Sequence, residues 1–141
     1  MIYVIEKNDE KYYFLNTNNT SIVLLKNKYD YLFILHWGSL ISPTNLDYVL
    51  KELNRASYLA DANGVKDFKL EQMPQIYPSY GYSDLREPAF SIRYQDGSRI
   101  TDLRYDSYKI YKTKKKLKGL PTIISKESES IDLILIDKIK K

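Results

Sequence analysis

The sequence predicts an all-β fold, an antiparallel β-sandwich with one short helix. Short runs rich in Ile, Val, Leu, Tyr and Phe recur between clusters of turn-forming residues. Tyrosine, a residue common in half-buried strands, accounts for 14 of the 141 residues. One segment only has the apolar spacing of a helix. This texture, strands throughout with a single helix, is typical of a sandwich.

Four strands are predicted in the first third of the chain. Their apolar runs occupy residues 2–5, 12–15, 21–26 and 31–37. The polar stretch "NTNNT" closes the second run with a turn, and Gly38 stops the fourth. The third and fourth runs are almost continuously apolar, which indicates strands that are buried on both faces.

The helix is predicted directly after these strands, within residues 42–56, with Ser42-Pro43 as an alternative start. Thr44 with Asp47 resembles a capping box, and four apolar residues follow at helical spacing: Leu46, Val49, Leu50 and Leu53. Further strands are predicted at residues 89–94, 99–105, 108–111, 122–124 and 131–136, with a short one at 68–70. "QDGS" between the first two of these has the Asp-Gly signature of a tight hairpin turn.

Composition indicates one globular domain, residues 1–141, with 43% hydrophobic and 28% charged residues. No apolar run approaches the roughly 20 residues that a membrane helix needs. The N-terminus has no apolar core of the signal-peptide kind. Because the chain has no cysteine, a cytoplasmic location is the default expectation.

Net charge and metal-binding residue types exclude several function classes. The net charge of +4 would suit a nucleic-acid-binding protein, but the basic block "KTKKKLKG" at 112–119 has no interleaved aromatic residues. We interpret it instead as a solvated strand edge, where lysines prevent pairing with another edge. His36 is the only histidine, so the usual zinc spacings are excluded, and we expect it to have a packed or hydrogen-bonded structural role. No phosphate-binding loop, nucleophile elbow or spaced carboxylate pair is present. We therefore predict no catalytic residue, metal or cofactor in this chain.

Several motifs in order carry a family resemblance. They are "FILHWG", "YPSYGYSDLREPAF", "DGSRITDLRYDSYKIYK", "LKGLP" and "SIDLILID". Their sequence and separations resemble the start of bacterial α-galactosidases of glycoside hydrolase family 36. The resemblance implies that residues 1–141 form all or part of an N-terminal β-supersandwich domain. In that family the catalytic residues lie in a later (β/α)8 barrel, which needs about 250 residues.

The resemblance also implies the chain's partners. They are the catalytic barrel of the same enzyme, neighbouring subunits of a homo-oligomer such as a tetramer, and the α-galactoside substrate of the full-length enzyme. Nucleic acid and membrane are not expected partners. The isolated chain is expected not to be an enzyme, whereas the full-length protein would hydrolyse terminal α-galactosides.

Two residues are candidates for substrate binding by resemblance. The family places an aspartate that reaches the galactose pocket where this chain has Asn54, which carries no charge and can both donate and accept hydrogen bonds. Trp37 ends a predicted strand and is expected to support that loop at the pocket edge. The chain also departs from the family pattern at Ile76 and Leu85.

The stretch "IYPSYGYSDLREPAF" is predicted to be mainly structural. Its proline and glycine residues, Gly81 among them, shape a loop, and Tyr77 is expected to pack. Asp84 and Arg86 are expected to fix this loop through a charge-assisted contact. A different class of function remains as an alternative: a free-standing carbohydrate-binding module with Trp37 and tyrosines as stacking platforms. A buried interface would favour the first interpretation, and an exposed row of aromatic rings the second.

Overall fold

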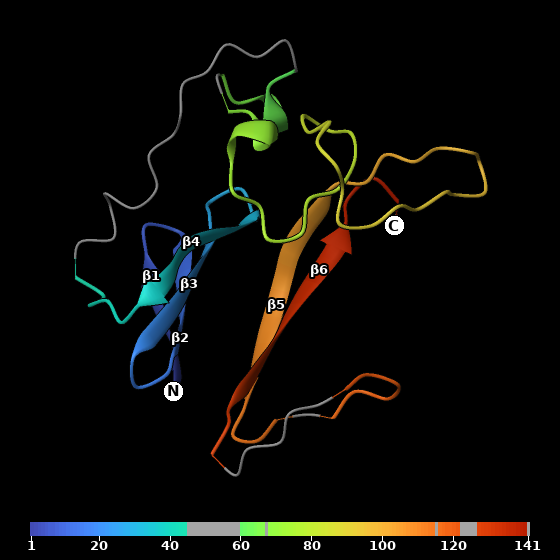
Figure 1. The fold of residues 1–141 in the computed structure, drawn as a ribbon. Helices are drawn as coiled ribbons and strands as arrows, with labels where there is room; N and C mark the ends of the chain where they lie inside the picture. The colour runs from blue at the N-terminus through green and yellow to red at the C-terminus, as the bar shows by residue number, and fades with distance from the viewer. Residues whose placement is uncertain (45–59, 67, 115, 122–126, 141) are drawn as a thin grey trace.

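The computed structural model describes residues 1–44, 60–66, 68–114, 116–121 and 127–140. These residues form six strands in two antiparallel sheets (Figure 1). The larger sheet has the order β1-β2-β3-β4, with bounds Ile2–Lys7, Glu10–Asn16, Thr20–Lys26 and Leu32–Ser39. The smaller sheet pairs β5 (Leu103–Tyr111) with β6 (Ser130–Asp137). Two short 3-10 helices, η2 (Ala62–Gly64) and η3 (Leu70–Gln72), complete the regular structure of the described residues.

The four-stranded sheet is a meander because short polar turns reverse the chain between its strands. Asn8 and Asp9 both have positive φ, 53° and 62°. Positive φ at both central residues is typical of the two-residue hairpin turn whose twist matches that of the flanking strands. In the turn before β4, the Asn27 side-chain oxygen accepts hydrogen bonds from the backbone N–H groups of Tyr29 and Tyr31. Asparagine and aspartate favour such turns because their side chains bond to nearby backbone groups.

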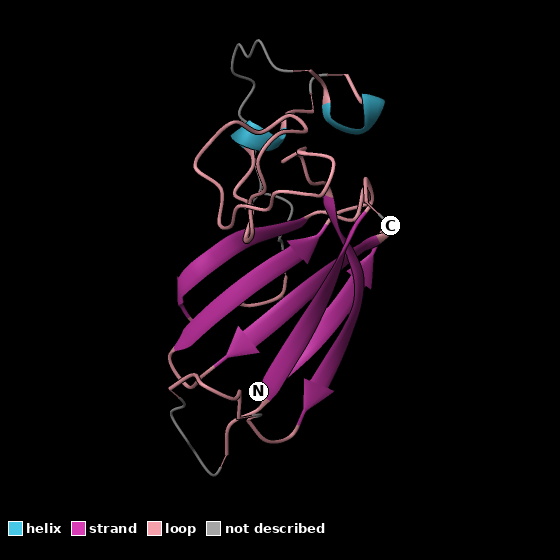
Figure 2. Cartoon of the chain, turned by 90° about the vertical axis from the view of Figure 1, so that its right-hand side faces the viewer, coloured by secondary structure: helices cyan, strands magenta, loops and turns pink. Residues whose placement is uncertain are grey.

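Both faces of the four-stranded sheet are covered. One face packs against the loop segment that contains η2 and η3, with these buried members: Tyr12, Phe14, Val23, Leu25, Tyr31, Phe33, Ala62, Phe68, Leu70 and Met73. The other face packs against the β5–β6 sheet, through Tyr13, Leu24, Leu32 and Tyr105 and the half-buried apolar residues of β6. The predicted burial on both faces is therefore confirmed for the third run and for the start of the fourth, whereas the end of the fourth run, at Trp37, is exposed. Figure 2 shows η2, η3 and their loops gathered beyond one end of the strands.

The predicted fold class, an antiparallel β-sandwich, is confirmed, and its first four strands lie where the apolar runs predicted them. The second half differs. Residues 89–94 form no strand, and the two strands predicted at 99–105 and 108–111 are one strand, β5, with a bulge between Tyr105 and Ser107. The loop at 78–80 takes backbone hydrogen bonds that a strand would use. Ala89 N–H donates to Pro78 O and Thr101 N–H donates to Tyr80 O, so neither group pairs with a neighbouring strand.

The Asp-Gly turn is present at its predicted place. Tyr94 N–H donates to Ser98 O at 3.0 Å, and Gly97 has φ +83°. Residues 68–70 lead into η3 and form no strand. The predicted strand at 122–124 lies outside the described residues, as does nearly all of the predicted helix, residues 45–59. Within the described part, no helix is long and apolar enough to cross a membrane.

Candidate functional site

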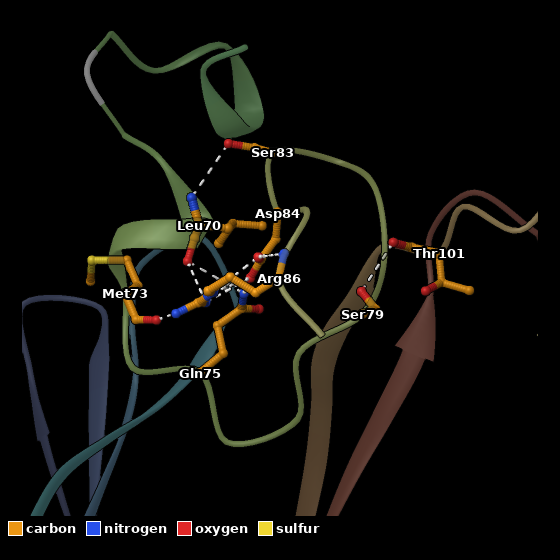
Figure 3. Close-up of polar contacts among 8 residues, drawn as sticks. All are labelled: Leu70, Met73, Gln75, Ser79, Ser83, Asp84, Arg86 and Thr101. Atoms are coloured by element: carbon orange, nitrogen blue, oxygen red, sulfur yellow. Dashed lines mark hydrogen bonds and ion pairs between the residues drawn. The ribbon is translucent and has the colours of Figure 1, made fainter. Parts of the chain in front are cut away.

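A buried carboxylate organises the loop segment between η3 and β5. Asp84 is 1% exposed and lies between Arg86 and Gln75 (Figure 3). Arg86 Nε donates to Asp84 Oδ1 at 3.0 Å and Nη2 donates to Oδ2 at 2.6 Å, while Gln75 Nε2 donates to Oδ2 at 2.6 Å. Two hydrogen bonds from a charged guanidinium and one from an amide offset the cost of burying this carboxylate.

The same guanidinium also holds the backbone beside η3. Arg86 Nη2 donates to the carbonyl oxygens of Leu70 and Met73, each at 3.0 Å. Ser83 Oγ accepts a hydrogen bond from Leu70 N–H, and Ser79 Oγ donates to Thr101 O (Figure 3). Segments that are distant in sequence are thus joined by one polar cluster, so the predicted contact of Asp84 with Arg86 is a structural device that shapes this loop.

Gly81 and Tyr77 lie in the same loop. Gly81 has φ +88° and exchanges two backbone hydrogen bonds with Asp84, at 2.9 and 2.8 Å. Tyr77 is half exposed and stacks on Phe90, with ring centroids 5.1 Å apart. The loop therefore needs glycine at one position for its backbone conformation and uses an aromatic pair to pack the segment that follows Pro88.

Gly81→Ala should lower the free energy of unfolding by about 2–3 kcal/mol, because two penalties combine. A Cβ at this position would lie 2.8 Å from Ile100 Cγ2, and the positive φ disfavours any residue with a side chain. Gly97→Ala is the matched control, since Gly97 has φ +83° but no atom within 4 Å of a Cβ. Urea denaturation should show a cost of about 1 kcal/mol for the control. Equal costs for the two variants would show that contact with Ile100 has no effect.

Asp102 and Arg104 form a second ion pair that the sequence analysis missed. Their side chains are 5% and 9% exposed, and Arg104 Nε donates to Asp102 Oδ1 at 2.7 Å. Arg104 Nη1 donates to Tyr29 O at 2.7 Å, and the guanidinium carbon lies 4.0 Å from the Tyr31 ring centroid. Tyr31 hydroxyl donates to Asp102 Oδ1 at 3.0 Å. Burial, followed by the Asp102 charge, raises the pKa of Tyr31, which keeps this hydroxyl protonated as a donor.

A repeated tripeptide could have indicated this second pair. "DLR" occurs at 84–86 and again at 102–104. In an extended backbone, residues two apart point to the same side, which suits the Asp102–Arg104 pair at the start of β5. The Asp84–Arg86 pair lies in a loop, where Arg86 N–H also donates to Asp84 Oδ1 at 3.0 Å. The middle leucine is exposed in the first copy, Leu85, and half-buried in the second, Leu103.

Trp37 lies at the far end of β4 from these ion pairs. It is 76% exposed, in contrast to the buried residues at the start of the strand. His36, next to it, has Nε2 2.9 Å from Ser39 O, in keeping with the expected structural role. Trp37 lines a groove of about 880 Å³ together with residues of β1, β2, β3 and the segment before β6. Asn54, the other candidate substrate-binding residue, lies outside the described residues.

Chemistry in the described part is that of binding and packing. The residues with placed side chains contain no group of three or more His, Cys, Asp or Glu that could hold a metal ion. The two most enclosed carboxylates, Asp84 and Asp102, are each paired to an arginine within the same tripeptide. Fold and site therefore define a class of protein domain: a two-sheet antiparallel β-sandwich whose loops are fixed by buried Asp–Arg pairs.

Comparison with known proteins identifies the family. Residues 30–141 match the glycosyl hydrolase family 36 N-terminal domain, and the chain belongs to this family. Alpha-galactosidase AgaA of Geobacillus stearothermophilus is 31% identical over 132 residues, which are 92% of this chain and 18% of the relative. The chain thus spans about a fifth of the length of the relatives it matches, and it corresponds to their N-terminal domain.

Solved structures agree with the fold. The crystal structure of alpha-galactosidase AgaB from Geobacillus stearothermophilus has a TM-score of 0.83 at 31% identity, over 97% of this chain and 19% of that one. A variant of AgaA from the same organism, solved in complex with raffinose, has a TM-score of 0.80 at 31% identity, over 89% of this chain and 18% of that one. The family resemblance predicted from the sequence is confirmed.

Proposed function

We propose that this domain serves an α-galactosidase that removes terminal α-galactosyl groups from its substrates. The observation that carries the proposal is the similarity of 97% of the chain to the N-terminal part of alpha-galactosidase AgaB, at a TM-score of 0.83. A barrel of about 250 residues cannot fit in 141, so the hydrolytic step would belong to a separate catalytic domain of the same polypeptide. The role of this domain is then to bind and position other parts of the enzyme.

The exposed apolar residues support a packing role. On the loop side, seven large hydrophobic residues between 76 and 100 are more than a third exposed: Ile76, Tyr77, Tyr80, Tyr82, Leu85, Ile92 and Ile100. Exposed apolar groups gathered in one stretch of chain are typical of an interaction surface. We propose that this surface contacts the catalytic domain or a neighbouring subunit of a homo-oligomer.

Asn54 and Trp37 are proposed as residues at the edge of a galactoside pocket. An amide side chain can both donate to and accept from sugar hydroxyls, and an exposed indole offers a flat apolar face. The single-residue effect is testable because a carboxylate accepts hydrogen bonds more strongly than an amide does.

In a complete enzyme that carries this domain, Asn54→Asp should raise kcat/KM for an aryl α-galactoside, and Asn54→Ala should lower it, each by about fivefold. Steady-state kinetics of the three proteins measure this. The 141-residue chain alone should show no turnover above the buffer blank, which tests that hydrolysis needs the catalytic domain. Unchanged kcat/KM in both variants would remove Asn54 from the pocket edge. A complete enzyme without α-galactosidase activity would overturn the proposed function itself.

A further inference from the structure

A continuous row of apolar side chains crosses one end of the four-stranded sheet. The register pairs Ile2 with Leu15, Leu15 with Ile22, and Ile22 with Trp37. Since directly paired residues point to the same face, these four side chains lie side by side. Leu15 and Ile22 are on the face that the β5–β6 sheet covers. Trp37 shares that face because it is paired with Ile22.

This row forms the floor of the groove. The sheets face each other along Tyr13, Leu24 and Tyr105, but β6 begins only at Ser130. At the end of the sheet where the N-terminus lies (Figure 1), the described walls are the β2–β3 turn and residues 127–129. The volume of about 880 Å³ falls in the range of small-molecule sites, about 300–1,000 Å³.

Trp37 gives the groove a flat apolar surface. The side chain is 76% exposed and lines the groove, so its indole ring is accessible to a ligand. A pyranose ring has an apolar face of C–H groups and a hydroxylated edge, so it can pack on an indole while its hydroxyls reach polar neighbours. The aliphatic floor beside the indole extends the contact beyond a single ring.

The rim supplies polar groups but few positive charges. Asn18 is exposed and lines the groove, so its side-chain amide is accessible to a ligand. Thr17 and Thr20 hydroxyls lie 2.6 Å apart at the same turn. The carboxylates of Glu127 and Glu129 also line the groove.

Charge decides the class of ligand. Among the described residues that line the groove, the only cation is the N-terminal amine, which donates to Asn16 O at 2.7 Å and lies 3.5 Å from Glu129 Oε2. Phosphorylated and other anionic ligands are normally held by arginine, lysine or several free N–H groups, and the described part of the lining contains no arginine or lysine. An aromatic platform with amide and hydroxyl groups, whose described residues include no arginine or lysine, suits an uncharged polyhydroxylated molecule.

We propose that this groove binds an uncharged, galactose-containing oligosaccharide, with Trp37 stacked on a sugar ring and Asn18 bonded to its hydroxyls. The choice of a galactose-containing sugar rests on the proposed function. The site itself rests on the floor, the rim and the charge described above.

The single tryptophan makes the test direct. Trp37 is the only tryptophan in the chain, so fluorescence excited at the red edge of the absorption band, where the 14 tyrosines hardly absorb, reports on the groove alone. Raffinose should produce a saturable blue shift of the emission, with a dissociation constant of about 1 mM. Polyethylene glycol of similar mass at the same concentration should produce none. The proposal is overturned if raffinose gives no saturable shift at concentrations far above the expected dissociation constant. It is equally overturned if polyethylene glycol gives the same shift.

Two neighbouring asparagines provide a matched pair of variants. Asn18→Ala should weaken raffinose binding about fivefold, because it removes one hydrogen-bonding side chain. Asn19→Ala should leave it unchanged, since Asn19 belongs to the same turn but does not line the groove. Trp37→Ala should abolish the raffinose signal in saturation-transfer NMR, and circular dichroism should show that its fold is retained. Equal affinities for the Asn18 and Asn19 variants contradict the assigned rim.

The outcomes separate this inference from the proposed function. Raffinose binding to the chain alongside a complete enzyme that lacks α-galactosidase activity would support the groove and overturn the proposed function. An active complete enzyme, with no raffinose binding to the 141-residue chain, would overturn the groove and leave the proposed function standing.

Discussion

Arg104→Ala should lower the free energy of unfolding by about 3–5 kcal/mol, the largest effect that we expect from a single substitution here. The variant leaves the Asp102 carboxylate, whose side chain is 5% exposed, without its guanidinium partner. It also leaves Tyr29 O without the donor at 2.7 Å and removes the cation from the Tyr31 ring. Domains of this size are stable by about 5–15 kcal/mol, so urea denaturation should show a large fall in the midpoint.

Three further variants make this result specific. Arg93→Ala removes an exposed arginine of the same chain and should change stability by less than about 0.5 kcal/mol. Arg104→Lys keeps the charge but loses the planar fork, so its cost should lie between those two. In a double-mutant cycle, Asp102→Asn combined with Arg104→Ala should cost less than the sum of the single variants, because no unpaired charge remains. Additive costs would show that the two side chains do not stabilise each other.

Arg86→Ala should lower the free energy of unfolding by about 2–4 kcal/mol. The expected cost is smaller than for Arg104 because the Arg86 side chain is 43% exposed, so water partly replaces its bonds. Asp84 would keep the bond from Gln75, but the carbonyls of Leu70 and Met73 would lose their shared donor. Denaturation gives the total cost. Hydrogen exchange should locate it, with the largest loss of protection between Leu70 and Arg86.

Glu87→Ala is the matched control for this loop. Glu87 is exposed and directly follows Arg86, and its replacement should change stability by less than about 0.5 kcal/mol. If Arg86→Ala behaves like this control, or if protection is lost evenly over the whole domain, the polar cluster does not hold the loop on the sandwich.

Local sequence determined the strands of the first sheet and the presence of a sandwich. The apolar runs of β1 to β4 are short, separated by polar turns, and in β3 nearly continuous, so period and turn chemistry were sufficient to predict them and their burial on two faces. The ordered motifs also determined the family, because several motifs at set separations are far more specific than any one of them.

Tertiary structure decided the second half and the candidate site. Residues 89–94 alternate between apolar and polar side chains, as in a strand, yet Ala89 N–H donates to Pro78 O and Thr101 N–H donates to Tyr80 O. Local β-propensity cannot predict such contacts, because the bonding partner lies elsewhere in the sequence. The exposure of Trp37 also depends on where a distant strand begins, since β6 starts at Ser130 and leaves the row from Ile2 to Trp37 beside a groove. Sequence fixes which side chains share a face through the two-residue period of a strand, but only packing between sheets determines which part of that face is covered.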